Sequence, residues 1–354
     1  METNVLLALC SKLERLTIHI TDSEGKEQRT NFDLLHYLGR NHGTISGLAG
    51  LGHLEINTNK CNRFSIGDTE VPLFLQQSHR LETLVLRGPE GNRLPDDHLA
   101  FAIQRFQPGL QNLTRLQITS WSFFGVERDS YILGEMVKMA KNLTSFTFST
   151  DSDGTWGNHH IRPHHIPPAR FIKLLKPLEG TLQDLSLDFD SKIYASSYQS
   201  PDLMTISPQQ IHKFARLESL KLDISCYCRH VFGRKKIGSS FDQKTCLTDL
   251  LPLTVRNLSI LFSEKGWWEC LPDFLYLGER VKAGEFPNLQ RVRIDAPVCY
   301  ETPCSNNWDD EWDNKRLGQI SDILRGRKQE FKAAFAGSKV DVGFHSWFIW
   351  ESMY

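Results

Sequence analysis

The chain has 354 residues, of which 40% are apolar and 23% are charged, and its formal net charge is −1. This length exceeds one compact core, so it indicates either two globular domains or an architecture that grows by repetition. The near-zero charge excludes a general attraction to nucleic acid or anionic lipid, and no apolar run is long enough to span a bilayer.

The first ten residues, METNVLLALC, have a short apolar core but carry Glu2 where a secretion signal needs positive charge. We interpret them as the end of a repeat helix, so the chain is expected to begin inside a repeat. The eight cysteines form no dense disulfide framework. These features predict an intracellular protein, cytoplasmic or nuclear, with neither a signal peptide nor a transmembrane segment.

Nine short phrases of the form apolar-x-x-apolar-x-apolar recur along the chain, with 30 to 39 residues between their central apolar positions. These positions are Leu16, Leu54, Leu84, Leu116, Phe146, Leu185, Leu220, Leu258 and Val292. Apolar and polar residues alternate at the end of each phrase, which is typical of a strand with one buried face.

Between the phrases the apolar spacing changes to that of a helix burying one side. The two clearest sets are Leu99, Ala102, Ile103 and Phe106, and Phe171, Leu174, Leu175 and Leu178. A capping box at Ser207, with Pro208 at the first helical position, predicts a further helix start.

One strand and one helix per repeat predict an α/β fold, a leucine-rich-repeat solenoid of about nine repeats shaped as a horseshoe. Parallel strands are expected on its concave face and helices on its convex face. We assign residues 1–300 to this solenoid. Residues 301–354 are assigned to a C-terminal capping segment with an acidic Trp loop, a helix and the terminal strand VDVGFHSWFIW. The N-x-S/T triplets at Asn112, Asn142 and Asn257 lie at strand entrances, so we interpret them as part of the repeat.

The phrases LLALCSKLERLTI from Leu6 and LLKPLEGTLQDLSLDF from Leu174 resemble the helix-to-strand passages of fungal leucine-rich-repeat proteins that are commonly linked to an F-box. The resemblance covers roughly residues 5–300. It implies a substrate receptor, in which the F-box binds the adaptor of a cullin-type ubiquitin ligase and the repeats bind the target. No F-box is recognisable here, so adaptor binding is expected only if one is encoded upstream. The Asn that usually follows the strand phrase stands only at Asn59, so we expect no asparagine ladder there.

The polar positions of the strand phrases predict a partner-binding surface on the concave face. They are Arg15, His19, His53, Glu55, Arg87, Arg115, Gln117, Asp184, Asp188, Lys221, Asp223, Arg291 and Arg293. Half of all strand residues face solvent anyway, so any single one can be there for solubility alone. Taken together on one rigid platform, they predict protein binding.

The stretch WGNHHIRPHHIPP is expected to form a rim loop between the fifth strand phrase and the helix that follows. It contains His159, His160, His164 and His165. Zinc needs three or four converging ligands, whereas no Cys or carboxylate lies between these histidines. We interpret the loop as a polar rim contacting a partner, without metal or cofactor. A metal-binding or enzymatic protein using this loop is the alternative.

Two further segments, one rich in cysteine and one acidic with two tryptophans, are candidate sites. In CYCRH, the cysteines Cys226 and Cys228 lack the spacing of structural zinc sites, so we expect a solvated rim loop whose thiol pKa values are lowered by the basic run after it. The acidic segment ETPCSNNWDDEWD is interpreted as a lid over the end of the sheet, with a partner contact as the alternative.

Glycine-rich phosphate loops, H-E-x-x-H and G-x-S-x-G are not found in the sequence. We predict a non-enzymatic protein–protein recognition module, binding neither nucleic acid nor membrane, and related to the substrate receptors of ubiquitin ligases. A degenerate, truncated F-box protein without a partner remains a further alternative.

Overall fold

The structure is a computed structural model of the full chain, and it describes ten stretches and one isolated residue. They are residues 12–21, 50–60, 75, 78–87, 107–119, 127–149, 167–189, 205–228, 245–262, 270–299 and 325–349, with side chains left undescribed at the ends of some elements.

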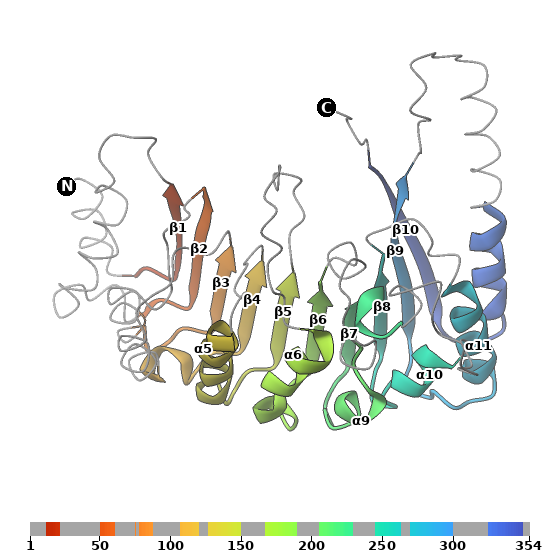
Figure 1. The fold of residues 1–354 in the computed structure, drawn as a ribbon, viewed down its shortest axis with the longest axis horizontal. Coiled ribbons are helices and arrows are strands. Elements are labelled where there is room, and N and C mark those ends of the chain that lie inside the picture. The colour runs from red at the N-terminus through yellow and green to blue at the C-terminus, as the bar shows by residue number, and fades with distance from the viewer. Residues whose placement is uncertain are drawn as a thin grey trace, which may run out of the picture. The chain divides into compact units, whose positions relative to one another are not determined.

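The described strands form one parallel sheet in which each strand lies beside the strand that follows it in sequence (Figure 1). They are β1 (Arg15–Thr21), β2 (His53–Lys60), β3 (Thr83–Arg87), β4 (Arg115–Thr119), β5 (Ser145–Ser149), β6 (Asp184–Asp188), β7 (Ser219–Asp223), β8 (Asn257–Leu261), β9 (Arg291–Cys299) and β10 (Asp341–Ile349). Nine of these contain the central apolar positions of the nine predicted phrases, and the tenth lies in the predicted terminal strand. The α/β class and the parallel sheet are therefore confirmed.

Short helices separate many of these strands. They are α5 (Glu127–Met139), α6 (Pro168–Leu174), η3 (Lys176–Leu178), α9 (Pro208–Ile211), η4 (Ile224–Cys226), α10 (Cys246–Leu250) and α11 (Leu271–Lys282), together with helical residues 107–110 and 325–334. None of the helices in the described residues is long and apolar enough to cross a membrane.

The sequence-predicted helices are present where they can be compared. The capping box at Ser207 is formed, and it begins the single turn α9. The stripe from Phe171 to Leu178 is divided between α6 and the 3-10 turn η3, because Pro177 has no N–H to continue an α-helix. The helix predicted around Leu99 and Phe106 lies outside the described residues.

The chain divides into two compact units, with the division inside β6. Unit 1 comprises Met1–Ser186 and Phe214–Arg216, and unit 2 comprises Leu187–Lys213 and Leu217–Tyr354. Both β9 and β10, which flank the predicted boundary at residue 300, belong to unit 2.

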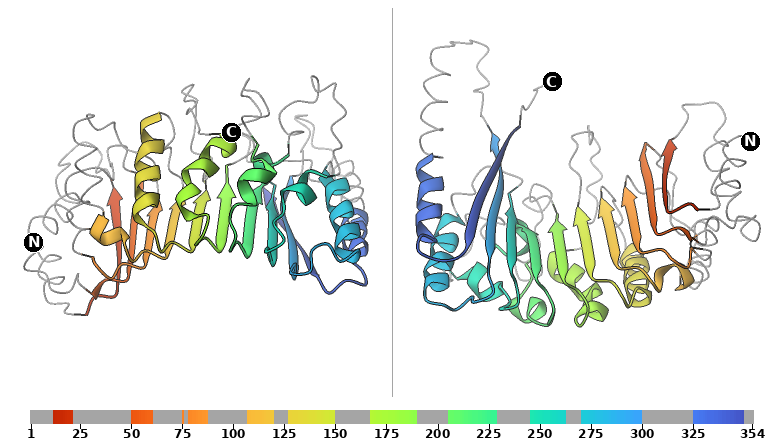
Figure 2. Two further views of the ribbon diagram at one scale, coloured as in Figure 1. Left: turned by 90° about the horizontal axis from the view of Figure 1, so that it is seen from below. Right: turned by 180° about the vertical axis from the view of Figure 1, so that it is seen from behind.

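In unit 1 the core lies between the strands and the helices on one face of the sheet (Figure 2). The second and fourth residues of β2 to β5 are buried, as strand alternation requires. Phe171 of α6 packs against Phe148 of β5, with ring centroids 4.8 Å apart, and against Phe146 at 5.9 Å. A helix that begins with proline thus covers the apolar face of β5.

In unit 2 aromatic residues join the helices to the sheet. Phe274 of α11 lies 6.3 Å from Phe262, which follows β8, and 5.8 Å from Phe331 of the 325–334 helix. Phe331 also makes an edge contact with Phe335 at 5.5 Å. The Lys328 ammonium lies 4.4 Å from the ring of Phe344 on β10. The 325–334 helix therefore packs against both α11 and the last described strand.

Candidate recognition surface

The strands are held in register by a backbone contact that recurs at their entrances. The carbonyl before one strand accepts N–H bonds from two consecutive residues of the next. In unit 1 the Glu82 carbonyl accepts from Thr114 and Arg115, and the Thr114 carbonyl accepts from Thr144 and Ser145, at 2.9 to 3.0 Å. The same pair of bonds recurs in unit 2, where the Glu218 and Arg256 carbonyls are the acceptors. This repetition places equivalent residues of successive strands side by side.

Side chains reinforce the entrances. The Asn112 amide donates to the His79 carbonyl at 2.6 Å, and the Asn142 amide donates to the Gln111 carbonyl at 2.9 Å. In unit 2, Asn288 donates to Leu253 in the same way at 2.9 Å. Asparagine side chains therefore bond successive repeats before the strands. The sequence analysis had considered only the position after the strands, where it expected no ladder.

In the described part of unit 1 the helices lie on one face of the sheet, and we call the opposite face the open face of unit 1 (Figure 2). Three rows of in-register side chains cross it. The first row is Arg15, His53, Thr83, Arg115 and Ser145; the second is Thr17, Glu55, Val85, Gln117 and Thr147; the third is His19, Asn57, Arg87, Thr119 and Ser149. All seven residues predicted on β1 to β4 thus lie on one face.

Two polar contacts organise this face. Arg87 and Glu55 form an ion pair across β3 and β2, with the Arg87 Nε and Glu55 Oε1 atoms 2.8 Å apart. The N–H is not aligned on the oxygen, so the contact is an ion pair rather than a hydrogen bond. On β4 the Gln117 amide donates to the Thr119 hydroxyl at 3.4 Å. The charge of Glu55 is therefore paired with that of Arg87.

His53 lies in the first row of the open face, beside Arg15 and two strands from Arg115. Burial lowers the pKa of its imidazole, and the positive charge of Arg15 lowers it further; Glu55 raises it, and Arg115 lowers it again. His53 is therefore neutral at pH 7, and it presents hydrogen-bonding nitrogens between two charged guanidinium groups.

The two acidic residues predicted on β6 lie on the same strand face. Asp184 is exposed and Asp188 is half-buried. Ser186 stands between them on this face, since side chains alternate along a strand.

The face of β7 to β10 that none of the described helices of unit 2 covers is the open face of unit 2. Its rows are Ser219, Asn257, Arg291 and Asp341; Lys221, Ser259, Arg293 and Gly343; and Asp223, Leu261, Asp295 and His345. Of the predicted residues, Arg291 and Arg293 are exposed and Lys221 is half-buried.

Charges on the open face of unit 2 are largely balanced. Arg291 pairs with Asp341 across the two last strands at 3.5 Å. Asp295 accepts a hydrogen bond from the Ser259 hydroxyl at 3.0 Å, and its carboxylate lies 3.8 Å from the His345 imidazole. Arg293 extends over Gly343, where an added Cβ would lie 3.5 Å from the arginine Cγ. Because glycine has no side chain, residue 343 leaves room for the aliphatic part of Arg293.

Asp223 does not belong to this surface, although its position in β7 has the right parity. It is fully buried, and its carboxylate accepts a hydrogen bond of 2.7 Å from the Ser225 N–H at the start of η4. Its function is to cap that turn, so we leave it out of the recognition surface.

The interpretation of CYCRH as a solvated rim loop is wrong for its first three residues. Cys226, Tyr227 and Cys228 are all buried, because η4 turns the chain inward directly after β7. The expected lowering of thiol pKa values is also wrong for Cys226. Burial first, and then the charges of Asp223 and Asp188, raise its pKa well above the usual value. Cys226 is therefore a protonated core thiol. Arg229 and His230 lie outside the described residues.

Behind this turn lies a buried group of polar side chains. The Cys228 and Cys270 sulfur atoms are 3.7 Å apart, although 42 residues separate them in the sequence. Burial raises the pKa of the Tyr227 phenol well above its usual value, with smaller contributions from Cys270 and Asp273. Both Cys228 and Cys270 are buried, free thiols.

Several predicted features cannot be placed. The histidine loop of His159, His160, His164 and His165 lies outside the described residues, and so does the acidic Trp segment of residues 301–313. In the part of the chain that the structure describes, no group of three or more His, Cys, Asp or Glu side chains is arranged to hold a metal ion.

The sequence analysis missed Asn57, Asp295 and His345 as members of the open faces. Each continues the apolar–polar alternation one step beyond its phrase, or lies on the terminal strand that was interpreted only as a cap. Following the alternation to the end of each strand would have found them.

Comparison of the chain with models of known protein families finds no match, and comparison with curated proteins finds none either. The resemblance to fungal F-box-linked leucine-rich-repeat proteins therefore stays a prediction.

Proposed function

We propose that this protein is a non-enzymatic recognition module of the leucine-rich-repeat type, and that its open faces bind a partner protein. The observation that carries the proposal is the set of in-register rows of polar side chains on the helix-free face of a parallel sheet. Neighbouring strands lie about 4.8 Å apart, so these rows form a closely spaced and rigid array.

The repeated hydrogen bonds at the strand entrances support the repeat architecture. The central apolar residue is buried in every strand from β2 to β9. The paired bonds to one carbonyl recur from β1 to β6 and again from β7 to β9. Each unit leaves an apolar side for its neighbour, so we propose that the units stack into a solenoid with strands on the concave face and helices on the convex face.

The chemistry of the open faces also favours recognition. Their arginines, hydroxyls and amides are groups that make specific hydrogen bonds at protein interfaces, and arginine is enriched there. Following the resemblance stated above, we propose that the bound partner is a target for ubiquitination. That step requires an F-box supplied by a longer form of the chain or by another protein.

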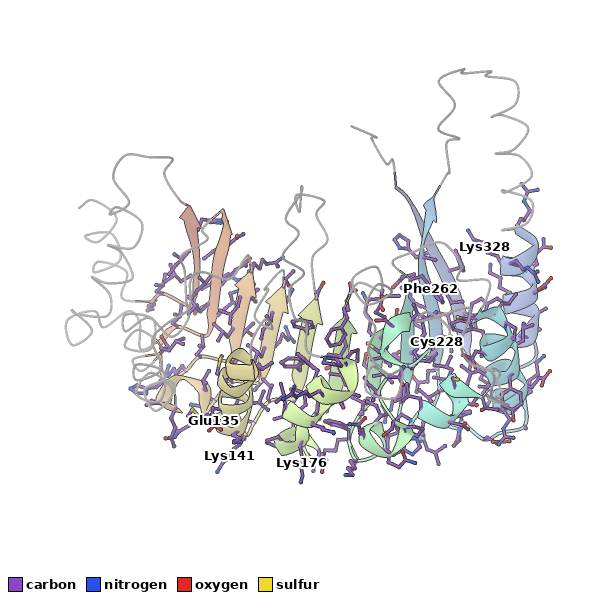
Figure 3. All side chains as sticks on the ribbon, viewed as in Figure 1. Glu135, Lys141, Lys176, Cys228, Phe262 and Lys328 are labelled. Carbon is purple, nitrogen blue, oxygen red and sulfur yellow. The ribbon has the colours of Figure 1, made fainter. Side chains whose placement is uncertain are left out.

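The experiment is a comparison of co-purified proteins. Wild-type protein is compared with a charge reversal on the open face of unit 2, Lys221→Glu with Arg293→Glu. The control reverses two exposed lysines outside the open faces, Lys141→Glu before β5 and Lys176→Glu in η3, and so makes the same change in net charge (Figure 3).

We expect a defined set of proteins to be lost from the open-face variant and retained by the control. If both variants keep the same proteins as the wild type, and an equivalent reversal on the open face of unit 1 does so too, the open faces are not the binding surface. Circular dichroism of each variant verifies that folding is unchanged.

A further inference from the structure

The open face of unit 1 differs from that of unit 2 in its charge. Across its three rows stand Arg15, Arg87 and Arg115 but only one carboxylate, that of Glu55. Glu55 is committed to Arg87 at 2.8 Å. On the open face of unit 2, by contrast, Arg291 and His345 each have an acidic neighbour on the adjacent strand. Asp184 adds one exposed carboxylate to unit 1, but it lies on β6, beyond the three rows. The rows on β1 to β5 therefore carry positive charge that their own residues do not neutralise.

That excess is located on the first row. Within the described residues, neither Arg15 nor Arg115 has a carboxylate at ion-pairing distance, and both are exposed. His53 and Thr83 stand between them on β2 and β3. The positive charges of both arginines lower the pKa of His53, so both act on the middle of the row.

The spacing of the two arginines suggests the form of the ligand. Arg15 and Arg115 lie three strand spacings apart, which is about 14 Å at the usual separation of parallel strands. An extended peptide rises about 3.4 Å per residue, so two of its side chains that are four residues apart, and on the same side, are separated by about the same distance.

We propose that the open face of unit 1 binds an extended acidic segment of the partner protein, whose two carboxylates, four residues apart, contact Arg15 and Arg115. The segment crosses the strands along the first row, and its middle residue lies over His53 and Thr83. Guanidinium groups bind carboxylates through two parallel hydrogen bonds, which gives the contact geometric specificity as well as charge. This inference rests on the proposed function and names the chemistry of the partner.

The test measures fluorescence anisotropy of two labelled peptides of equal composition at low salt. Both are short and made of glycine, serine and threonine with two glutamates, which are four residues apart in one peptide and adjacent in the other. The protein is used as the full chain, in wild-type form, as Arg15→Gln with Arg115→Gln, and as the control Lys141→Gln with Lys176→Gln. The control removes the same charge at exposed sites of unit 1 outside the open face.

Wild-type protein is expected to bind the spaced peptide more tightly than the adjacent one. Each exposed arginine–carboxylate pair changes a dissociation constant by on the order of twofold to fivefold, so the double arginine variant should bind about tenfold more weakly. The lysine control should stay within about twofold of the wild type, and the interaction should weaken with added salt.

Three results would overturn the inference. They are equal binding of the two peptides, unchanged binding by the double arginine variant, and absence of binding to either peptide. A fourth result would also overturn it: a single-stranded oligonucleotide binds more tightly than the spaced peptide, and the double arginine variant loses that binding. The surface would then recognise nucleic acid. The co-purification on the unit 2 variants is a separate measurement, so a failure of the acidic-segment hypothesis is distinguishable from a failure of the proposed function.

Discussion

The same substitution, glycine to alanine in the middle of a helix, is expected to have opposite effects in α5 and α11. An alanine is favoured over glycine in a helix interior by about 0.5–1 kcal/mol when nothing else changes. At Gly134 in α5 an added Cβ would meet only the Leu174 Cδ2 atom at 3.7 Å, an ordinary contact. Gly134→Ala should therefore stabilise the protein by about 0.5–1 kcal/mol.

At Gly278 in α11 the added Cβ would collide with the 325–334 helix. It would lie 2.6 Å from the Ala334 carbonyl oxygen and 2.8 Å from the carbonyl carbon. These are backbone atoms, so they cannot rotate away. Overpacking of this kind costs about 1–3 kcal/mol, which exceeds the gain in helix propensity, so Gly278→Ala should destabilise the protein by about 1–2 kcal/mol.

The assay is urea unfolding followed by circular dichroism, combined with hydrogen exchange of residues 271–282 and 325–345. We expect Gly278→Ala to unfold at lower urea and to exchange faster in both segments, because the helices must move apart. Gly134→Ala should unfold at higher urea and leave these segments unchanged. A Gly278→Ala variant as stable as wild type would refute the close approach of the two helices.

Three other predictions concern single side chains. The hydroxyl of Tyr227 is buried and has no hydrogen-bond partner among the described residues, so Tyr227→Phe should leave stability unchanged or raise it by up to about 1 kcal/mol; a loss of that size in thermal unfolding contradicts the burial. The pKa of His53 is lowered in the folded protein, so the unfolded chain takes up a proton first, and stability is lost as pH falls below the unfolded value of about 6.5. His53→Gln should remove that part of the loss, so the unfolding free energy of the variant should change less between pH 7.5 and a pH below about 6.5. An equal change in both proteins would contradict the lowered pKa of His53. Asn142→Ala should cost about 0.5–1.5 kcal/mol through its bond to the Gln111 carbonyl, whereas the adjacent Lys141→Ala should cost less than about 0.5 kcal/mol; equal costs would argue against this asparagine bond between repeats.

The strands could be predicted from sequence because their signal is local. Leu54, Leu116 and Phe146 are each followed by a polar and then an apolar residue, and each proves to be fully buried in a strand. The terminal strand carries the same alternation, so β10 could be predicted too. Both predictions use local sequence only and do not require the residues that each strand packs against.

Other features depend on contacts between residues far apart in the sequence. The CYC segment looks solvated because a basic run follows it, yet Cys228 is buried against Cys270, which is 42 residues away. The alternation along β7 places Asp223 at a surface position, but its carboxylate is buried because it accepts a hydrogen bond from the turn that follows the strand. The close approach at Gly278 is likewise decided by Ala334, which no local pattern connects to it.

The central claim, that the partner protein binds the helix-free face of the sheet, is tested most directly by site-specific photo-crosslinking. A photoreactive amino acid is placed at Thr147 on the open face of unit 1, at Ser259 on the open face of unit 2, or at Glu135 in α5. We predict partner crosslinks from one or both of the open-face positions and none from Glu135. Crosslinks from Glu135 alone would contradict the account.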